Sequence, residues 1–272
     1  MSRADDVSRR LACAVRIALE AGRVTMGYFR RADVRVETKS DASPVTIADR
    51  ESECRLRDRI GAEFPDDGVL GEEFGETRGS SGFRWIVDPI DGTKSFIFGV
   101  PLFGVLIGVE RAGRSVAGVI HIPALGETVY AEQGGGCWYR GVGEAPVPAR
   151  VSATRRLSDG LFVTSQVDSF ARRGAASAFD ALQSRAAVTR TWGDAYGYSL
   201  VATGRAAAMV DPLMHIWDAA ALQPVIEEAG GRFTDWQGRP SIDSGEAIGS
   251  NGLVHDEVLA VTRPFGHSHA GA

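Results

Sequence analysis

The stretch that decides the fold is residues 85–96, which read W-I-V-D-P-I-D-G-T-K-S-F. Its first three residues are apolar and predict a buried strand. Pro89 fixes its own φ and has no N–H, so it predicts that the chain leaves the sheet in a tight turn. Such a turn can direct Asp88, Asp91 and the Ile90 carbonyl towards one point. Two carboxylates about 4 Å apart repel by roughly 4 kcal/mol at an effective dielectric constant of 20, so the turn needs a cation. Oxygen ligands favour Mg²⁺ over Zn²⁺.

The two residues after the turn are Gly92 and Thr93. If a helix begins there, its free N–H groups form a phosphate site beside the cation. Asp-Pro and Asp-Gly are also common turn dipeptides, and a lone D-P-x-D-G motif is more often a plain turn than a metal site. The functional interpretation therefore depends on the other motifs of the chain.

Composition excludes several classes of function. The chain has 272 residues, of which 44% are hydrophobic and 24% charged, as in a globular protein with a substantial core. The net charge of −5 gives no basic footprint for nucleic acid or a membrane surface. Three widely spaced cysteines argue for a reducing compartment and against structural zinc. The first residues lack the apolar core of a signal peptide, and no apolar run approaches the roughly 20 residues that span a bilayer. We therefore expect a cytoplasmic protein.

Periodicity predicts two helices and a mostly antiparallel meander in the first half. Apolar residues recur every three or four positions over residues 6–29, which predicts an amphipathic helix. A second helix is expected to begin at Thr46, where Thr46 and Asp49 fit a capping box. Asp49 is thus open to two interpretations, a capping acid or a functional one. Strands are expected at 34–38, 69–71, 100–109, 114–122 and 127–132, with a short hairpin around residues 138–139.

Near residue 150 the pattern changes to alternating strands and helices, which favours an α/β second half. Strands are expected at 161–165, 188–191 and 206–211, and helices at 169–185, 194–203, 217–229 and after Asn251. Pro224 inside the helix at 217–229 removes a hydrogen bond to Ala220 and predicts a kink. We divide the chain into an N-terminal α+β domain at 1–150, a C-terminal α/β domain at 151–265 and a disordered tail at 266–272.

Two further acids stand at the ends of predicted elements. Glu72 follows the apolar run V-L-G at 69–71 and is paired with Glu73, and paired glutamates are usually solvated surface. Asp218 lies in the first turn of the helix at 217–229, where an acid complements the helix dipole. Each acid, taken alone, has a plain structural interpretation.

Four separated signals nevertheless occur together in one order. They are Lys39 to Asp49, Gly71-Glu72-Glu73, the turn at 88–93, and Trp217-Asp218 followed by E-A-G-G at 228–231. In this order and spacing they resemble the inositol monophosphatase family of Mg²⁺-dependent phosphatases, over about residues 10–260. The stretches W-G-D-A-Y-G-Y at 192–198 and S-N-G-L-V-H at 250–255 look most like the bacterial histidinol-phosphate phosphatase branch of that family.

The resemblance implies an α/β fold, a layered αβαβα sandwich, and a site that holds two or three Mg²⁺ ions. By position, Glu72, Asp88 and the Ile90 carbonyl would hold the first ion. Asp88, Asp91 and Asp218 would hold the second, with Asp88 as the bridge.

The same resemblance assigns the remaining parts of the site. Gly92 and Thr93 would donate N–H groups to the phosphate, and Thr93 and Asp49 would position the attacking water, beside Glu72 as the third catalytic residue. Lys39 would lie on a mobile loop that closes over the site. Relatives commonly form homodimers, so a homodimer is expected. Ser95 stands where the family often has Asn, and a hydroxyl can replace the amide in a helix-start hydrogen bond.

The implied reaction is hydrolysis of L-histidinol phosphate to L-histidinol and phosphate by metal-activated water, a step of histidine biosynthesis. This substrate carries an ammonium and an imidazole, so its pocket should offer acids besides the metal ligands Asp91 and Asp218. Asp194, at a predicted helix start, and Asp211, at a predicted strand end, are candidates. Both have structural alternatives, as a helix cap and as a turn acid before Pro212.

Two alternatives to histidinol phosphatase activity stay open. Fold and metal motif are shared with inositol-1-monophosphatases and broader small-molecule phosphatases, so the motif cannot separate the substrates. The non-enzymatic alternative is a catalytically silent scaffold or regulatory protein with this fold, and the retained acids speak against it. A dinucleotide-binding enzyme is disfavoured, because no G-x-G-x-x-G follows a first strand.

Overall fold

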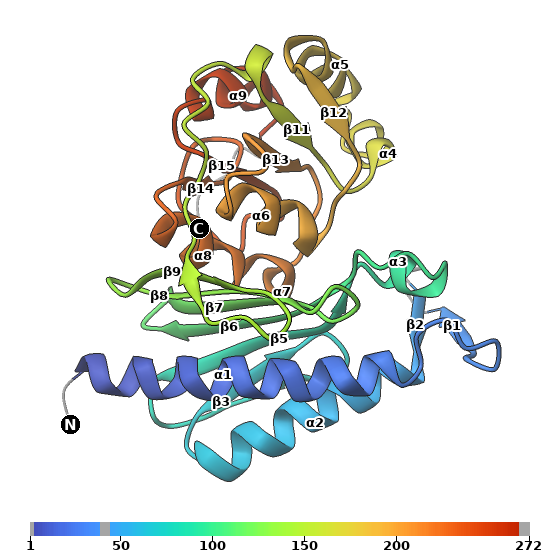
Figure 1. The fold of residues 1–272 in the computed structure, drawn as a ribbon, viewed down its shortest axis with the longest axis vertical. Helices are drawn as coiled ribbons and strands as arrows, with labels where there is room; N and C mark the ends of the chain where they lie inside the picture. Colours follow the sequence, from blue (N-terminus) through green and yellow to red (C-terminus); the bar gives the residue numbers. More distant parts are fainter. Residues whose placement is uncertain (1–2, 39–43, 267–272) are drawn as a thin grey trace.

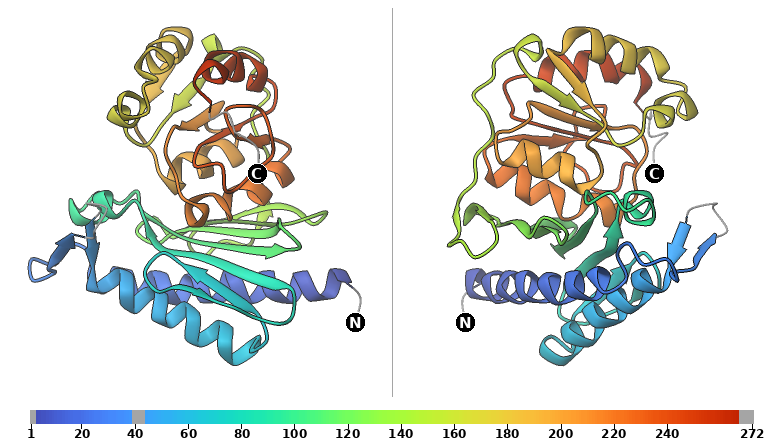
Figure 2. Two further views of the ribbon diagram at one scale, coloured as in Figure 1. Left: turned by 180° about the vertical axis from the view of Figure 1, so that it is seen from behind. Right: turned by 45° about the vertical axis from the view of Figure 1, so that its right-hand side comes forward.

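The computed structural model of the protein describes residues 3–38 and 44–266. Lys39 and residues 267–272 of the tail predicted at 266–272 lie outside these residues. The described chain forms a layered αβαβα sandwich, in which helices and two sheets alternate (Figures 1 and 2). No helix among residues 3–38 and 44–266 is long and apolar enough to cross a membrane.

The outer helical layer of the first half consists of α1 (Arg3–Met26) and α2 (Ile47–Glu63). Both helices lie across one face of the larger sheet (Figure 1). Their apolar residues pack against strand residues such as Trp85, Val87 and Val119 in one buried cluster. Between them, β1 (Val36–Thr38) and β2 (Pro44–Thr46) form a separate antiparallel pair. The predicted helix at 6–29 therefore exists, although it ends at Met26.

The larger sheet has eight strands in the order β10-β9-β8-β7-β6-β5-β3-β4. Its strands are β3 (Gly68–Gly71), β4 (Gly75–Thr77), β5 (Phe83–Asp91), β6 (Gly104–Arg111), β7 (Arg114–Ile122), β8 (Glu127–Glu132), β9 (Gly136–Arg140) and β10 (Val147–Pro148). Only the β3–β5 pair in this sheet is parallel. The expected antiparallel meander is thus confirmed.

The decisive stretch departs from its predicted form in one respect. The strand does not end at Val87: β5 continues to Asp91, and its register against β6 shifts between Asp88 and Asp91. Pro89 lies inside this irregularity, where a missing N–H costs no ladder hydrogen bond. Gly92 then takes a left-handed conformation, with φ at 80°, and α3 (Thr93–Ile97) begins after it. The predicted tight turn is therefore a strand bulge followed by a glycine.

The smaller sheet has five strands in the order β12-β11-β13-β15-β14. They are β11 (Leu161–Val163), β12 (Val188–Arg190), β13 (Ala208–Asp211), β14 (Arg232–Thr234) and β15 (Ala247–Ser250). The first three are parallel, as the α/β pattern predicts, whereas β15 runs antiparallel to both β13 and β14. The sequence pattern did not predict β14 or β15.

Helices cover both faces of the smaller sheet (Figures 1 and 2). The inner layer contains α6 (Ala195–Ala202), α7 (Ile216–Ala219) and α8 (Leu222–Glu228), and the outer layer α4 (Val167–Arg172), α5 (Ala176–Arg185) and α9 (His255–Thr262). Short 3-10 turns lie at Leu157–Asp159 and Arg263–Phe265. The single helix expected at 169–185 is two helices, because Gly174 between them has φ at 78°.

The helix expected at 217–229 is also divided, and Pro224 explains why. Pro224 cannot donate to the carbonyl of Ala220, so the helical hydrogen-bond ladder is interrupted between Ala219 and Leu222, although Ala220 and Ala221 keep right-handed helical angles. The Ser115 hydroxyl on β7 donates to the Ala220 carbonyl instead, at 2.5 Å. The hydrogen-bond ladder is thus interrupted where the sequence predicts a kink, and Asp218 lies on the first segment, a helix of four residues.

One buried cluster connects the two sheets. It contains Ile86 and Leu106 from the larger sheet, Met209 from the smaller sheet, and Tyr198 and Val225 from the helices between them. The inner layer is therefore a core that both halves share. The division into domains at residue 150 stays a prediction.

Candidate active site

Three carboxylates from distant parts of the chain meet at the end of β5. Asp88, Asp91 and Asp218 each offer an oxygen, and these oxygens all lie within 4.8 Å of one another. Asp88 and Asp91 flank the bulge of β5. Asp218 is held by the start of α7, where its Oδ2 accepts the N–H of His215 at 2.7 Å. The bulge and the broken helix together therefore place these acids.

The cluster concentrates negative charge in a site where Asp88 is buried and Asp91 and Asp218 are partly buried. Asp88 is only 2% exposed, and burial raises its pKa well above the usual range, with Glu72 and Asp91 adding to the effect. Burial likewise raises the pKa of Asp91, and that of Asp218 to about 7. A hard divalent cation compensates such charge and prefers oxygen ligands, so this donor set fits Mg²⁺.

A cavity of about 450 Å³ opens over the three acids. Glu72 lines it from the end of β3, where the Glu72 N–H donates to the Val87 carbonyl at 3.3 Å. Ile90 also lines the cavity, and its carbonyl accepts the Thr93 hydroxyl at 3.1 Å. Every predicted metal-ligand residue therefore borders one cavity.

The first residues of α3 form another wall of this cavity. Gly92, Thr93, Lys94 and Ser95 all line it. A side chain at Gly92 would be strained at its positive φ, and its Cβ would lie 2.8 Å from Oδ2 of Asp194. Only glycine fits this position, so the start of α3 and the Asp194 carboxylate can approach closely.

Asp49 combines the two interpretations that the sequence left open. Its Oδ2 accepts the N–H and the hydroxyl of Thr46, at 2.7 and 2.6 Å, and so completes the predicted capping box. Its Oδ1 is buried and has no hydrogen-bond partner within the described part of the chain. Burial raises the pKa of Asp49 to about 6, and the charge of Glu72 adds to this. Asp49 is not one of the three clustered carboxylates.

The two acids predicted to bind substrate lie beside the cluster. Asp194 has φ at 51° and makes no capping hydrogen bond to α6. Burial raises its pKa, and its N–H donates to the Ser165 hydroxyl at 2.9 Å. Asp211 accepts the Tyr198 hydroxyl at 3.1 Å and the Ser165 N–H at 3.3 Å, and burial raises its pKa to about 6. Together with Asp91 they line an adjoining cavity of about 130 Å³.

The sequence interpretation missed several residues at the rim. Lys94 Nζ donates to Gln166 Oε1 at 2.5 Å, so α3 and the start of α4 approach across the cavity. The ring of His215 stacks on Trp217, with 4.8 Å between centroids. Lys94 and Trp217 belong to motifs quoted above, but the sequence analysis gave neither of them a role at the site.

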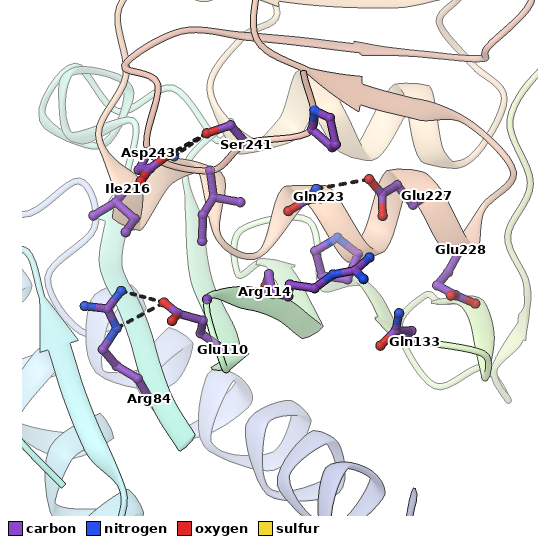
Figure 3. Close-up of a pocket in the computed structure, with 15 residues that line it drawn as sticks. Arg84, Glu110, Arg114, Gln133, Ile216, Gln223, Glu227, Glu228, Ser241 and Asp243 are labelled. Atoms are coloured by element: carbon purple, nitrogen blue, oxygen red, sulfur yellow. Dashed lines mark hydrogen bonds and ion pairs between the residues drawn. The ribbon is translucent and has the colours of Figure 1, made fainter. Parts of the chain in front are cut away.

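A second cavity, of about 570 Å³, lies between strands β5–β7 and α8 (Figure 3). Its glutamates are bound to neighbours: Glu110 to Arg84 at 2.5 Å, and Glu227 to Gln223 at 3.1 Å. Glu228 accepts the N–H groups of the turn between β8 and β9. The acids of this cavity therefore hold structure together, and the metal-ligand cluster lies elsewhere.

Known proteins match the chain along almost its whole length. The sequence profile of the inositol monophosphatase family matches residues 6–266. A histidinol-phosphatase of Chlorobaculum parvum is 45% identical over 253 residues, which cover 92% of this chain and 96% of that protein. A histidinol-phosphatase of Mycobacterium tuberculosis is 40% identical, with coverage of 92% and 96%. The solved structure of the extragenic suppressor protein suhB from Bartonella henselae superposes with a TM-score of 0.86 at 30% identity, over 94% of this chain and 98% of that one. The chain is therefore a phosphatase that belongs to the inositol monophosphatase family.

Proposed function

We propose that the protein is a Mg²⁺-dependent phosphomonoesterase that hydrolyses L-histidinol phosphate to L-histidinol and phosphate. The observation that carries this proposal is the cluster of Asp88, Asp91 and Asp218 inside a cavity bordered by the start of α3. The relatives that are named histidinol-phosphatases support the substrate. The family resemblance supports a cytoplasmic homodimer, for which sedimentation velocity is the direct test.

The residues of the cavity have distinct roles in this proposal. Glu72, Asp88, Asp91, Asp218 and the Ile90 carbonyl would hold two or three Mg²⁺ ions. Bound Mg²⁺ neutralises charge on the phosphoryl oxygens and lowers the pKa of water, which are the main needs of phosphate-monoester hydrolysis.

The chain's own groups then orient the reactants. The backbone N–H groups of Gly92 and Thr93 hold the phosphate against the cavity wall. Asp49 has a buried Oδ1 with no partner in the described residues, and this oxygen can accept a hydrogen bond from the attacking water. Its capping bonds to Thr46 keep the carboxylate in one orientation.

The charge of the cavity favours a cationic substrate. After the metal ligands are neutralised, the carboxylates of Asp194 and Asp211 remain in the cavities beside them. Lys94 offsets part of the charge of Asp194. An ammonium and an imidazole on the substrate would satisfy both acids, whereas inositol 1-phosphate brings only hydroxyl groups to the same positions.

The test compares phosphate release from L-histidinol phosphate and inositol 1-phosphate with Mg²⁺ present. We expect kcat/KM to favour histidinol phosphate by roughly 100-fold or more, about 2.7 kcal/mol in the transition state.

Asp194→Ala should raise KM for histidinol phosphate much more than for inositol 1-phosphate. If the wild-type protein prefers inositol 1-phosphate, histidinol phosphate is the wrong substrate, but the metal site is not contradicted. Loss of both activities when a chelator removes the metal would support the metal site independently of the substrate.

A further inference from the structure

The carboxylate of Glu53 lies beneath the turn that carries Glu72. Glu53 is on α2 and is fully buried. Its Oε2 accepts the N–H of Glu73 at 2.7 Å, and its Oε1 accepts the N–H of Phe74 at 3.3 Å. Gly71, just before the turn, permits this approach, since a Cβ at Gly71 would lie 2.1 Å from Oε1 of Glu53. A buried acid thus binds the backbone of the turn rather than a ligand.

The backbone of this turn is fixed from two sides. On one side, the Glu72 N–H donates to the Val87 carbonyl, directly before Asp88. On the other side, Arg57 donates to the Gly75 carbonyl and pairs with Glu53 at 2.7 Å. Glu72 therefore stands between β5 and α2, with its backbone held at the place where its side chain reaches the cavity.

One face of α2 connects this support to the capping acid of the site. Asp49, Glu53 and Arg57 follow one another at intervals of four residues, so they lie one above the other on the helix. Asp49 and Glu53 are both buried on this face. Any shift of α2 would move the support of Glu72 and the carboxylate of Asp49 together.

We propose that Glu53 is a positioning residue for the metal site. By holding the turn at residues 72–74, it keeps the Glu72 carboxylate directed at the cavity of Asp88 and so sets the Mg²⁺ affinity. The proposal rests on the metal-binding role of Glu72 in the proposed function. Groups that orient metal ligands through hydrogen bonds typically change metal affinity by about 10–100-fold when they are replaced.

The experiment measures Mg²⁺ binding to the metal-free protein by calorimetry, together with the Mg²⁺ concentration that gives half-maximal phosphate release. Glu53→Gln keeps the size of the side chain but loses the charge and one acceptor oxygen. We expect its Mg²⁺ dissociation constant to rise by about 10-fold or more. We expect kcat at saturating Mg²⁺ to stay within about threefold of wild type, because Glu53 touches no reacting atom.

Asp67→Asn is the matched control. Asp67 is also buried and pairs with an arginine, Arg10, at 2.7 Å, but it precedes the opposite end of β3 and does not line the cavity. Its replacement should lower the free energy of unfolding to a similar degree and leave the Mg²⁺ affinity unchanged. A general loss of stability is thereby distinguished from a loss of positioning.

Three outcomes decide between the interpretations. If Glu53→Gln binds Mg²⁺ as tightly as wild type while Glu72→Gln binds it weakly, the positioning role is wrong and the metal site stands. If Glu72→Gln also binds Mg²⁺ like wild type, Glu72 is not a metal ligand, and the metal site of the proposed function then rests on Asp88, Asp91 and Asp218. If Glu53→Gln does not fold, Arg57→Lys decides, since it keeps the charge beside Glu53 but loses the guanidinium fork. Weaker Mg²⁺ binding by Arg57→Lys supports the proposal, and unchanged binding overturns it.

Discussion

The clustered acids of the active site destabilise the folded protein when no metal is bound. Asp88 is buried beside Asp91, Asp218 and Glu72, and each neighbour raises its pKa further. Like charges in a poorly solvated site destabilise the folded chain unless a cation is present. The residues that the proposed function needs are thus the ones that the metal-free fold tolerates least.

Asp88→Asn tests this opposition directly. The substitution removes the central charge of the cluster, so the rate of phosphate release should fall by at least about 100-fold. This loss is larger than the one that typically follows replacement of residues that only hydrogen-bond to the metal ligands. Without Mg²⁺ at pH 8, the same variant should have a higher melting temperature than wild type. Assays of phosphate release and thermal unfolding of metal-free protein check both parts. A variant that keeps activity, or that melts earlier without metal, would contradict the assignment.

Asp49 and Glu53 show how far single residues can be predicted. The sequence left Asp49 between capping and function, and no pattern could decide, because a carboxylate has two oxygens and one is used for capping. Glu53 was missed. An acid four residues before an arginine on a helix resembles a solvated surface pair, and only the distant turn at residues 72–74 reveals its partners.

At the scale of elements, Asp218 lies just before the point between α7 and α8 where the helical hydrogen-bond ladder is interrupted. The break lies against β6 and β7 at two glycines, and a Cβ at Gly118 would lie 2.1 Å from the Ala221 carbonyl. The Ala220 carbonyl, which Pro224 cannot bind, accepts the Ser115 hydroxyl. The larger sheet thus supplies the hydrogen bond that the helix loses.

Ser115→Ala should therefore destabilise the protein. It leaves the buried Ala220 carbonyl without its donor, which typically costs about 1–3 kcal/mol. Ser115→Thr keeps the hydroxyl and suits a strand, so it should lie close to wild type. Denaturant unfolding of the three proteins gives the comparison. Equal stability of the alanine and threonine variants would mean that the hydrogen bond contributes nothing to folding.

An element was predicted correctly where the sequence pattern that indicates it lies within the element itself. The amphipathic pattern of α1 and the apolar runs of β6 and β7 lie within their own segments, so these elements were predicted. Strands β14 and β15 were missed, since they are defined by their pairing across the sheet rather than by a pattern within their own segments. The tight turn expected at Pro89 became a bulge because β6 continues to pair with Asp91.

At the scale of the whole molecule, the site lies where the two halves meet. Asp88 and Asp91 come from the larger sheet, and Asp194, Asp211 and Asp218 from the second half. Asp88 and Asp91 could be paired from the turn that carries them, whereas spacing along the chain does not predict that Asp218 joins them, which only the family resemblance implied. The shared core between the sheets holds the two groups of acids together.

The charge of the site makes the stability of the whole molecule depend on pH and Mg²⁺ together. Folding raises the pKa of Asp218 to about 7 and that of Asp211 to about 6, whereas the pKa of an aspartate in the unfolded chain is about 3.9. Between about pH 4 and pH 7 the folded chain binds more protons than the unfolded chain, so these groups lower the free energy of unfolding as pH rises. The buried histidines His121 and His255 have pKa values lowered to about 4, and they act in the opposite direction up to about pH 6.5.

The contribution of His121 and His255 cancels in the difference in melting temperature between Mg²⁺-saturated and metal-free protein, because neither histidine lines the cavity. Mg²⁺ and protons compete for the same carboxylates, so metal binding is weak where the acids are protonated. We expect the rise in melting temperature on addition of Mg²⁺ to be small at pH 5 and to grow up to about pH 7–8, where the raised pKa values are passed. Melting curves at four pH values, with Mg²⁺ and with chelator, give this difference. A rise that is constant from pH 5 to pH 8 would show that Mg²⁺ does not bind to the carboxylates with raised pKa values. In the absence of metal, the melting temperature of Asp218→Asn should depend less on pH than that of wild type.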